Sequence, residues 1–217
     1  MIAIDNAAKV YEGGVTALSG ISLRIEKGEC CFIQGPSGAG KTTLLNLIYG
    51  IERPTSGSVE VAGINPARAS HATLQGLRRH MGFAFQDFRL VEHWSAYENT
   101  AVVLEMAGKP RSYVRTRVWK VLEWVGLSNR MYERAADLSG GERQRLALAR
   151  ALVHTPEIIL ADEPAASMDH ESAQLVMGLI FRMHKRGMTV IIASHGKDFI
   201  GEGMSLLRLN HGMIEGS

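Results

Sequence analysis

Hydrophobic residues recur along this chain with two different periods. In several short segments they stand at every second position or in short unbroken runs, which is the pattern of β-strands. Glycine-containing turns at 13–14 and 27–28 separate the first of these segments. We predict strands at 1–6, 21–25, 29–34, 58–61, 81–85, 158–161 and 189–193.

Helical spacing replaces the strand pattern in three other regions. Apolar residues at 44–48 end at Gly50, and those at 175–183 end at Gly187, as is common where helices terminate. From about 87 to 154 the strand pattern disappears, and apolar residues three or four positions apart predict a helix before Gly126. These central residues are Val114, Val118, Val121, Leu122 and Val125.

Alternating strands and helices predict an α/β fold with a parallel sheet. The segment at about 87–154 has no strand pattern, so we expect a helical subdomain inserted into the α/β core. The 217 residues correspond to roughly one and a half average domains. We therefore expect a single domain over 1–217 that carries this helical lobe.

Composition excludes several other classes of protein. With 46% apolar and 21% charged residues, the chain has the balance of a globular protein rather than a disordered one. A net charge of +2 is too weak for nucleic-acid binding through phosphate neutralisation alone, and we expect no nucleic-acid partner. Four cations, interrupted by Glu123, are interpreted as a solvated helix face; they are Arg111, Arg115, Arg117 and Lys120.

The sequence also favours a cytoplasmic location. Its longest purely apolar stretches have four residues, whereas a bilayer span needs roughly 20. Asp5, Lys9 and Glu12 interrupt the start of the chain, so we expect no secretory leader. The adjacent Cys30 and Cys31 alternate faces if they lie on a strand, and they are expected to be reduced and to fill the core.

A glycine-rich loop between a predicted strand and a predicted helix fits the pattern G-x-x-x-x-G-K-[ST]. Such a loop directs successive backbone N–H groups at phosphate oxygens, and the helix N-terminus adds positive potential. Lys41 is placed to reach the β- and γ-phosphates, and Thr42 is a candidate Mg²⁺ ligand. The candidate phosphate-binding residues are Gly35, Pro36, Ser37, Gly38, Ala39, Gly40, Lys41, Thr42 and Thr43.

Two carboxylates follow the apolar run at 158–161. They stand at the carboxyl end of a predicted buried strand, where α/β sheets bind ligands. Asp162 suits Mg²⁺ coordination, and Glu163 is placed to orient or deprotonate a water in line with the γ-phosphate. An acidic pair after a strand is also common in plain turns, and the upstream phosphate loop favours the functional interpretation.

The pentapeptide Leu-Ser-Gly-Gly-Glu at 138–142 precedes a stretch rich in Arg, Leu and Ala, which form helices well. Ser139 is a natural N-cap for that helix, and the two glycines expose backbone N–H groups at its start. The chain therefore offers a second candidate anion site. Its residues are Ser139, Gly140, Gly141 and Glu142.

With these motifs the chain resembles the ATP-binding subunits of ABC transporters over essentially its whole length, and the pentapeptide is the decisive match. The resemblance implies a P-loop NTPase fold with an N-terminal antiparallel β subdomain, and Mg²⁺-dependent ATP hydrolysis. It also implies a head-to-tail homodimer, in which ATP lies between the 35–42 loop of one subunit and residues 139–141 of the other.

The same resemblance implies roles for four further residues. Tyr11 looks like the aromatic that stacks on adenine, and Gln86 looks like the residue that links Mg²⁺ and the attacking water to a membrane partner. His195 looks like the histidine at the γ-phosphate, which makes it catalytic together with Lys41, Gln86 and Glu163. Asp169 looks like the acid of the loop that crosses the dimer.

Within the family, the segments 50–57, 77–79, 85–88 and 161–164 are similar to the FtsE group of cell-division ATPases. This similarity implies an FtsX-like integral membrane partner, control of cell-wall hydrolases at the division site, and a peripheral position on the inner face of the membrane. Phe88 and Trp94 fall where the family contacts its membrane subunit, with core packing as the alternative.

Other functions remain open at this stage. Lipoprotein-release and macrolide-export ATPases share most of the same motifs, and a nucleotide-binding regulator without turnover would carry the same phosphate loop. A soluble DNA-repair or chromosome-organising ATPase also uses the pentapeptide, but such proteins carry long coiled coils and the sequence has no run of three or more heptads.

Overall fold

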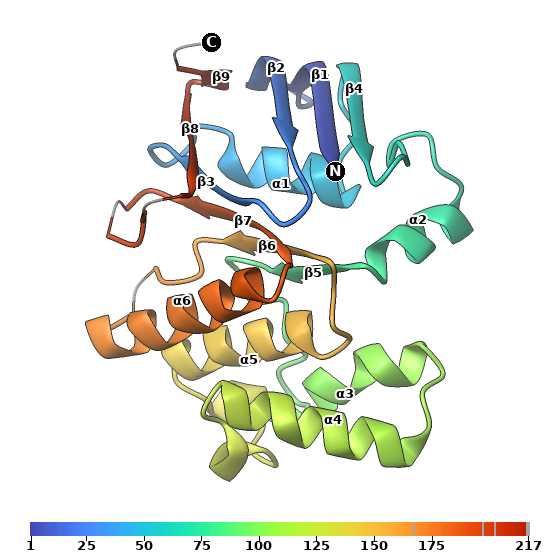
Figure 1. Cartoon of the computed structure of the whole chain (residues 1–217), viewed down its shortest axis with the longest axis vertical. Helices are drawn as coiled ribbons and strands as arrows, with labels where there is room; N and C mark the ends of the chain where they lie inside the picture. The colour runs from blue at the N-terminus through green and yellow to red at the C-terminus, as the bar shows by residue number, and fades with distance from the viewer. Residues whose placement is uncertain (167, 197, 202, 216–217) are drawn as a thin grey trace.

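A parallel β-sheet forms the centre of the molecule (Figure 1). The computed structural model describes residues 1–166, 168–196, 198–201 and 203–215. Long apolar runs form the inner strands, because helices cover both faces of the sheet and leave no side exposed to water. In spatial order the strands are β5 (Met81–Ala84), β6 (Ile158–Asp162), β7 (Thr189–Ser194), β3 (Cys30–Gln34), β8 (Ser205–Asn210) and β9 (Met213–Ile214), and only β9 is antiparallel to its neighbour.

A second, antiparallel sheet contains the N-terminal strands. Its order is β2 (Thr16–Ile25), β1 (Ile2–Val10) and β4 (Ser56–Val61). One face packs on helix α1 (Lys41–Tyr49), which lies between the two sheets in Figure 1. This arrangement confirms the predicted α/β fold with an antiparallel N-terminal subdomain.

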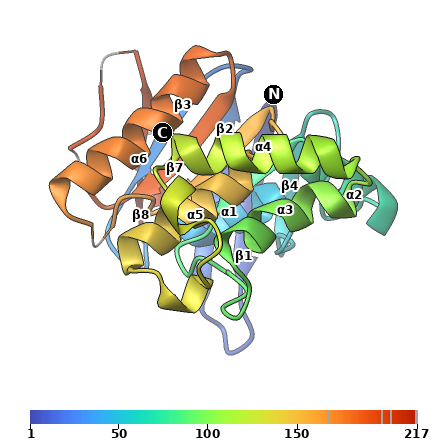
Figure 2. The same ribbon diagram turned by 90° about the horizontal axis from the view of Figure 1, so that it is seen from below.

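The remaining large helices cover the opposite face of the central sheet. The stretch expected to be helical contains α3 (Ala96–Met106), α4 (Arg111–Trp124) and α5 (Gly140–Leu152), and two short 3₁₀ turns at 128–130 and 135–137 lie between α4 and α5. Helix α6 (His170–Lys185) packs beside α5 against the sheet, and Figure 2 places α4 on the outside of this layer.

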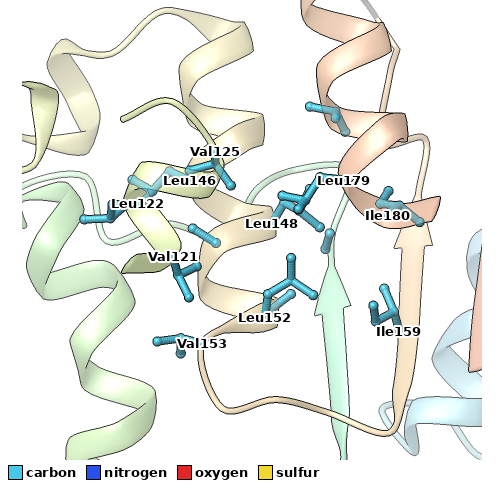
Figure 3. Packing of buried hydrophobic residues seen from close by; sticks show 14 of the residues in the cluster. Val121, Leu122, Val125, Leu146, Leu148, Leu152, Val153, Ile159, Leu179 and Ile180 are labelled. Atoms are coloured by element: carbon cyan, nitrogen blue, oxygen red, sulfur yellow. The ribbon is translucent and has the colours of Figure 1, made fainter. Parts of the chain in front are cut away.

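The predicted apolar stripe of α4 packs into this helical layer. Val121, Leu122 and Val125 meet Leu146 and Leu148 of α5, while Leu179 of α6 continues the cluster toward the sheet (Figure 3). All six side chains are at most 1% exposed. The helical lobe and the sheet therefore share one continuous core, which fixes the direction in which α5 points.

Three elements and one side chain differ from the sequence-based picture. Strand β8 and helix α2 (His71–Arg78) each bury one residue fully, Leu209 and Leu77 respectively, so neither has a strong apolar pattern, and β9 has only two residues. Arg117 does not belong to a solvated face. It is partly buried and donates hydrogen bonds to the carbonyls of Val153 (2.8 Å) and Leu152 (3.2 Å).

The two cysteines lie on β3 and point to opposite faces of the sheet, as the strand geometry requires. Cys30 packs in the cluster on the helical side and Cys31 in the cluster around α1, and both are free thiols. Burial raises the pKa of Cys30 to about 11 and that of Cys31 to about 12. Within the described ranges, no helix combines the length and apolarity that a bilayer crossing needs.

Candidate functional site

The carboxyl ends of four parallel strands meet at one edge of the central sheet, on the left of Figure 1. Strand β3 leads into the glycine-rich loop, β5 into Gln86, β6 into Glu163 and β7 into His195. Together with the start of β2 they surround a cavity of about 650 Å³. Every predicted phosphate-binding residue except Gly35 lines it, as do Tyr11, Gln86, Asp162, Glu163 and His195.

The glycines of the loop are required by its geometry. Gly40 caps helix α1 with φ = 104°, and a Cβ atom there would meet the carbonyl oxygen of Ala17. At Gly35 a Cβ atom would meet the carbonyl oxygen of Leu209. Gly38 also has a positive φ, of 77°, but faces open space. The loop therefore packs tightly against β2 and β8 while its middle stays accessible from the cavity.

Lys41 is buried and points back along the loop. Its Nζ donates to the carbonyls of Gly35 (2.8 Å) and Pro36 (3.1 Å) and lies 3.3 Å from Oε1 of Glu163. The Lys41 and Glu163 side chains are only 7% and 8% exposed. A buried ammonium and carboxylate at this distance compensate each other's loss of hydration, which makes removal of either one costly.

Glu163 is held in place from several directions. Its backbone has φ = 48°, a conformation that L-residues other than glycine adopt rarely and that clusters at functional sites. Its N–H donates to the carbonyl of Ala193 (2.9 Å), and Oε2 lies 2.9 Å from Nδ1 of His195. The carboxylate thus bridges Lys41 and His195, whose own side chain is 66% exposed.

Asp162 and Thr42 fit a magnesium ion. Asp162 is 2% exposed, and burial raises its pKa, while a hydrogen bond from the Thr42 side chain offsets part of the rise. Asp162 Oδ1 is buried and has no hydrogen-bond partner among the described residues, as expected of a carboxylate oxygen that binds a ligand. Gln86 adds an amide oxygen to the same cavity, and Mg²⁺ prefers such oxygen ligands.

No group of three or more His, Cys, Asp or Glu residues arranged for metal binding occurs in the described part of the chain. A magnesium ion bound here would therefore take most of its remaining ligands from phosphate oxygens and water, which is its usual mode in nucleotide sites.

Tyr11 also lines the cavity, beside the start of helix α1. Its hydroxyl is 3.2 Å from Oγ1 of Thr43, and Nζ of Lys9 lies 4.9 Å from the centre of its ring. The cavity wall continues through Val15, Thr16 and Ala17 at the start of β2, and Ala166 lies beyond Glu163. Sequence analysis did not identify these four residues, because no motif marks them. The approach of β2 to the loop brings the first three there, and the turn that follows Glu163 brings Ala166.

The second predicted anion site does not line this cavity. Ser139 caps α5, its hydroxyl accepting from the N–H of Glu142 (3.3 Å) while its own N–H donates to Oε2 of Glu142 (2.9 Å). This reciprocal capping box confirms the predicted helix start. The bond from the Ser139 N–H is the main cause of the lowered pKa of Glu142. Helix α5 begins on the left of Figure 1, at the same side as the carboxyl ends of the strands.

Asp169 also lies outside the cavity. Its exposed side chain caps α6 by accepting the N–H of Ser172 at 2.9 Å, and this bond lowers the pKa of Asp169. Within one chain, then, Asp169 has a structural function that its predicted role did not include.

A second hollow, of about 570 Å³, lies between α2, β5 and the helical lobe. Its lining includes Phe83, Phe85 and Val103, and none of the described residues that line it is acidic. Phe88 and Trp94, expected near a partner interface, are partly buried and do not line it. The basic residues of this groove are Arg78, Arg79, Lys109, Arg150 and His154.

Comparisons with known proteins agree with the site. A family model described as ABC transporter matches residues 18–166, more than half of the chain. The chain belongs to the ABC transporter family. It is similar to the cell division ATP-binding protein FtsE of Escherichia coli K12, at 37% identity over all of this chain and 98% of the relative. FtsE of Mycobacterium tuberculosis is 42% identical over 90% of this chain and 85% of the relative.

Solved structures support the same conclusion. The dimeric bacterial ABC transporter cassette MJ0796 has a TM-score of 0.94 at 33% identity, with 99% of this chain and 97% of that one covered. The same cassette in a post-hydrolysis state bound to ADP and phosphate has a TM-score of 0.94 at 32% identity, over the same shares of both chains. This member of the ABC family is thus an ATP-binding subunit with ATP hydrolase activity, similar to FtsE.

Proposed function

We propose that this ABC ATPase hydrolyses ATP in the cavity at the edge of the central sheet, with Glu163 as the residue that activates water. One observation supports this most strongly: the Glu163 carboxylate bridges Lys41 and His195 directly beside the phosphate loop. In this scheme Lys41 binds the β- and γ-phosphates, and Glu163 accepts a proton from the attacking water. His195 orients the carboxylate and contacts the γ-phosphate.

Asp162, Thr42 and Gln86 are the residues we propose to hold magnesium, on the basis of the unpartnered Asp162 oxygen. A bound magnesium ion neutralises charge on the phosphates. Tyr11 is proposed to stack on the adenine, since its aromatic ring lines the same cavity as the phosphate loop and already accepts a cation contact from Lys9.

Glu163→Gln tests this assignment, because it keeps the shape of the side chain and removes its basicity. We expect phosphate release to fall at least about 100-fold, while ATP binding persists, since Lys41 and the loop are untouched. Glu157→Gln is the control, as Glu157 is exposed and pairs with Lys27 and His80 rather than with residues of the cavity. Normal hydrolysis by Glu163→Gln would remove Glu163 from the catalytic role.

The active unit is proposed to be a head-to-tail homodimer. The Ser139–Glu142 turn lies outside the cavity of its own chain, and the phosphate loop of that chain is open at Gly38. A second copy would let each turn close the other copy's cavity, with Asp169 near the dimer interface. The domain assignment belongs to the same proposal: one ABC ATPase domain over 1–217, with residues 87–154 as its signalling subdomain.

The basic groove is the proposed docking site of an integral membrane partner. Its apolar floor and its rim of Arg78, Arg79 and Lys109 fit an amphipathic segment with acidic residues. Gln86 follows Phe85, whose ring belongs to the groove, so an occupant of the groove lies one residue from the nucleotide cavity. The chain would then be cytoplasmic and bound to the inner face of the membrane through this partner.

By its similarity to FtsE, we propose an FtsX-like partner and a role in control of cell-wall hydrolases during division. An ATPase subunit of a lipoprotein-release or macrolide-type exporter is the alternative. The longest described helix has 16 residues, which is too short for the long coiled coil of chromosome-organising ATPases.

Purification of the tagged chain from membranes of its own host tests the docking site. We expect one integral membrane protein to co-purify with the wild type, and Lys109→Glu to reduce its yield by about tenfold through charge repulsion at the rim. Lys185→Glu, at the far end of α6, is the control. Identification of the retained protein separates the division role from export, and equal retention by both variants would place the partner elsewhere.

A further inference from the structure

The turn that carries Gln86 has an unusual backbone. Phe88 and Arg89 are consecutive residues with positive φ, 58° and 49°, although neither is glycine. The N–H of Phe88 donates to the carbonyl of Phe85 (3.1 Å), which places Gln86 at the second position of a closed four-residue turn. Such backbone angles persist only where surrounding groups impose them.

Arg150 supplies that constraint from the far end of α5. Its Nη2 donates to the carbonyl of Phe88 and its Nη1 to the carbonyl of Arg89, both at 2.5 Å. The guanidinium plane thus holds the carbonyls of both strained residues at once. The Arg89 side chain adds a second contact, because its guanidinium lies 4.1 Å from the centre of the Phe85 ring at the start of the turn.

We propose that Arg150 is a positioning residue for hydrolysis: it fixes the turn from which Gln86 enters the nucleotide cavity and connects that turn to the helix that begins at Ser139. Helix α5 is a single rigid element with the Ser139 cap at one end and Arg150 near the other. A displacement of the Ser139 end therefore reaches Gln86 through Arg150. The same side chain lines the basic groove, so a docked partner contacts the same link.

This inference rests on the proposed function, since it explains how Gln86 is placed for the chemistry of Glu163. Arginine is needed because its planar fork reaches two neighbouring carbonyls together, whereas a lysine ammonium offers a single point charge. Arg150→Lys keeps the charge and loses the fork. We expect its kcat for ATP hydrolysis to fall about tenfold, as for one charge-assisted hydrogen bond, while the KM for ATP stays unchanged.

Arg117→Lys is the matched control. Arg117 also uses its fork on two consecutive carbonyls, those of Leu152 and Val153, and it does not line the nucleotide cavity. Both variants should lose similar stability in urea unfolding, but only Arg150→Lys should lose kcat. An equal loss of kcat in the two variants, or a wild-type kcat in Arg150→Lys, would overturn the proposal.

A double-mutant cycle tests the mechanism. Glycine adopts positive φ freely, so a chain with Phe88→Gly and Arg89→Gly no longer needs the clamp to form the turn. We expect Arg150→Lys to reduce kcat about tenfold in the original background and less than about twofold in the glycine background. A full tenfold loss in both backgrounds would contradict a role through the backbone of the turn.

Hydrogen exchange separates this proposal from the proposed function. The amides of Phe88 and Arg89 are hydrogen-bonded within the turn. Without nucleotide they should exchange about tenfold faster in Arg150→Lys than in the wild type or in Arg117→Lys. If the amides of Phe88 and Arg89 exchange at the wild-type rate in Arg150→Lys, the proposed role of Arg150 is overturned whatever the ATPase result. If they exchange faster as expected but Glu163→Gln still hydrolyses ATP, the role of Arg150 stands and Glu163 is rejected as the catalytic base.

Discussion

The nucleotide cavity and the Ser139 turn are the two phosphate sites that we propose, and they are built in opposite ways. In the cavity three charged side chains are nearly inaccessible, Lys41 at 7%, Glu163 at 8% and Asp162 at 2%, and an oxygen of Asp162 has no partner. At the turn Ser139 and Glu142 satisfy each other in a capping box, in contact with solvent.

This difference indicates which properties of the protein substitutions at each site should change. The cavity contains buried charged groups that can bind a ligand, so substitutions of its residues should affect both folding and ATP hydrolysis. The turn is complete within its own chain and offers the first N–H groups of a helix, which lack partners within the helix. Its residues should therefore affect assembly far more than folding.

The largest expected effect is that of Lys41→Met. Without the ammonium, the buried Glu163 carboxylate keeps its contact with His195 but loses its cationic partner, so we expect a loss of about 3 kcal/mol in unfolding free energy. ATP affinity should fall at least about 100-fold because the phosphates lose a charged donor. Urea unfolding and equilibrium ATP binding measure the two losses, with the exposed Lys27→Met as control.

Adding Glu163→Gln to Lys41→Met sharpens this result. The double variant no longer buries a Glu163 carboxylate without its cationic partner, so most of the stability should return while ATP binding stays weak. If the single and double variants are equally unstable, the Lys41–Glu163 pair does not have the energetic role assigned to it.

Gly140→Asp should produce a large effect on assembly and almost none on folding. A Cβ atom at Gly140 meets nothing within 4 Å, and an acidic residue in the first turn of a helix stabilises it by about 0.3–1 kcal/mol. The added charge would repel a phosphate presented by a second copy. We expect an unchanged or slightly higher unfolding midpoint and no ATP-dependent dimer in light scattering, measured in the Glu163→Gln background.

Gly76→Asp, on α2, is the matched control because a Cβ atom there also meets nothing within 4 Å. It should dimerise normally. Dimerisation of Gly140→Asp with ATP would show that the Ser139 turn does not face the phosphates of a partner copy.

The smallest effects concern two carboxylates whose pKa values are shifted in opposite directions. The pKa of Asp162 is raised, chiefly by burial, so the folded chain loses stability as pH rises through that pKa. The pKa of Glu142 is lowered, chiefly by the Ser139 N–H, so its stabilisation is present above the ordinary glutamate pKa and lost as pH falls.

We therefore expect Asp162→Asn to be more stable than the wild type at pH 7 without nucleotide, and Glu142→Gln to be less stable. Both differences should shrink as the pH falls: that of Asp162 begins to shrink above the ordinary aspartate pKa, and that of Glu142 only below the ordinary glutamate pKa, because the two shifts have opposite directions. Urea unfolding at a series of pH values from 7 downward measures the stability of each variant relative to the wild type. If both variants are more stable than the wild type at pH 7, or both less stable, the contrast between the two sites is wrong.

Local sequence patterns predicted most of the site. The phosphate loop, the acidic pair at the end of β6 and the Ser139 cap each follow from residue types at fixed spacing, and the structure places the first two together at the predicted sheet edge. The antiparallel strands β1 and β2 were predicted too short, because bulges shift the register of β1 and interrupt its alternation.

Residues whose placement depends on distant parts of the chain were harder to predict. Arg117 and Arg150 both look like surface cations in the sequence, since nothing local marks the carbonyls that they hold. Strand β8 has a weak pattern because it buries only Leu209 fully, and its position comes from pairing with β3.

The sequence by itself determined the chemistry: which residues carry charge, where glycine permits the loop to bind phosphate, and which family shares these motifs. Only the tertiary structure decided that Glu163 contacts both Lys41 and His195, and that the Ser139 turn lies outside the cavity of its own molecule. It also decided that Arg150 binds the carbonyls of the turn that carries Gln86. The physical reason is the separation of the residues along the sequence. Motifs consist of residues close together in the sequence, whereas these contacts form only after parallel strands align their ends and α5 packs across the sheet.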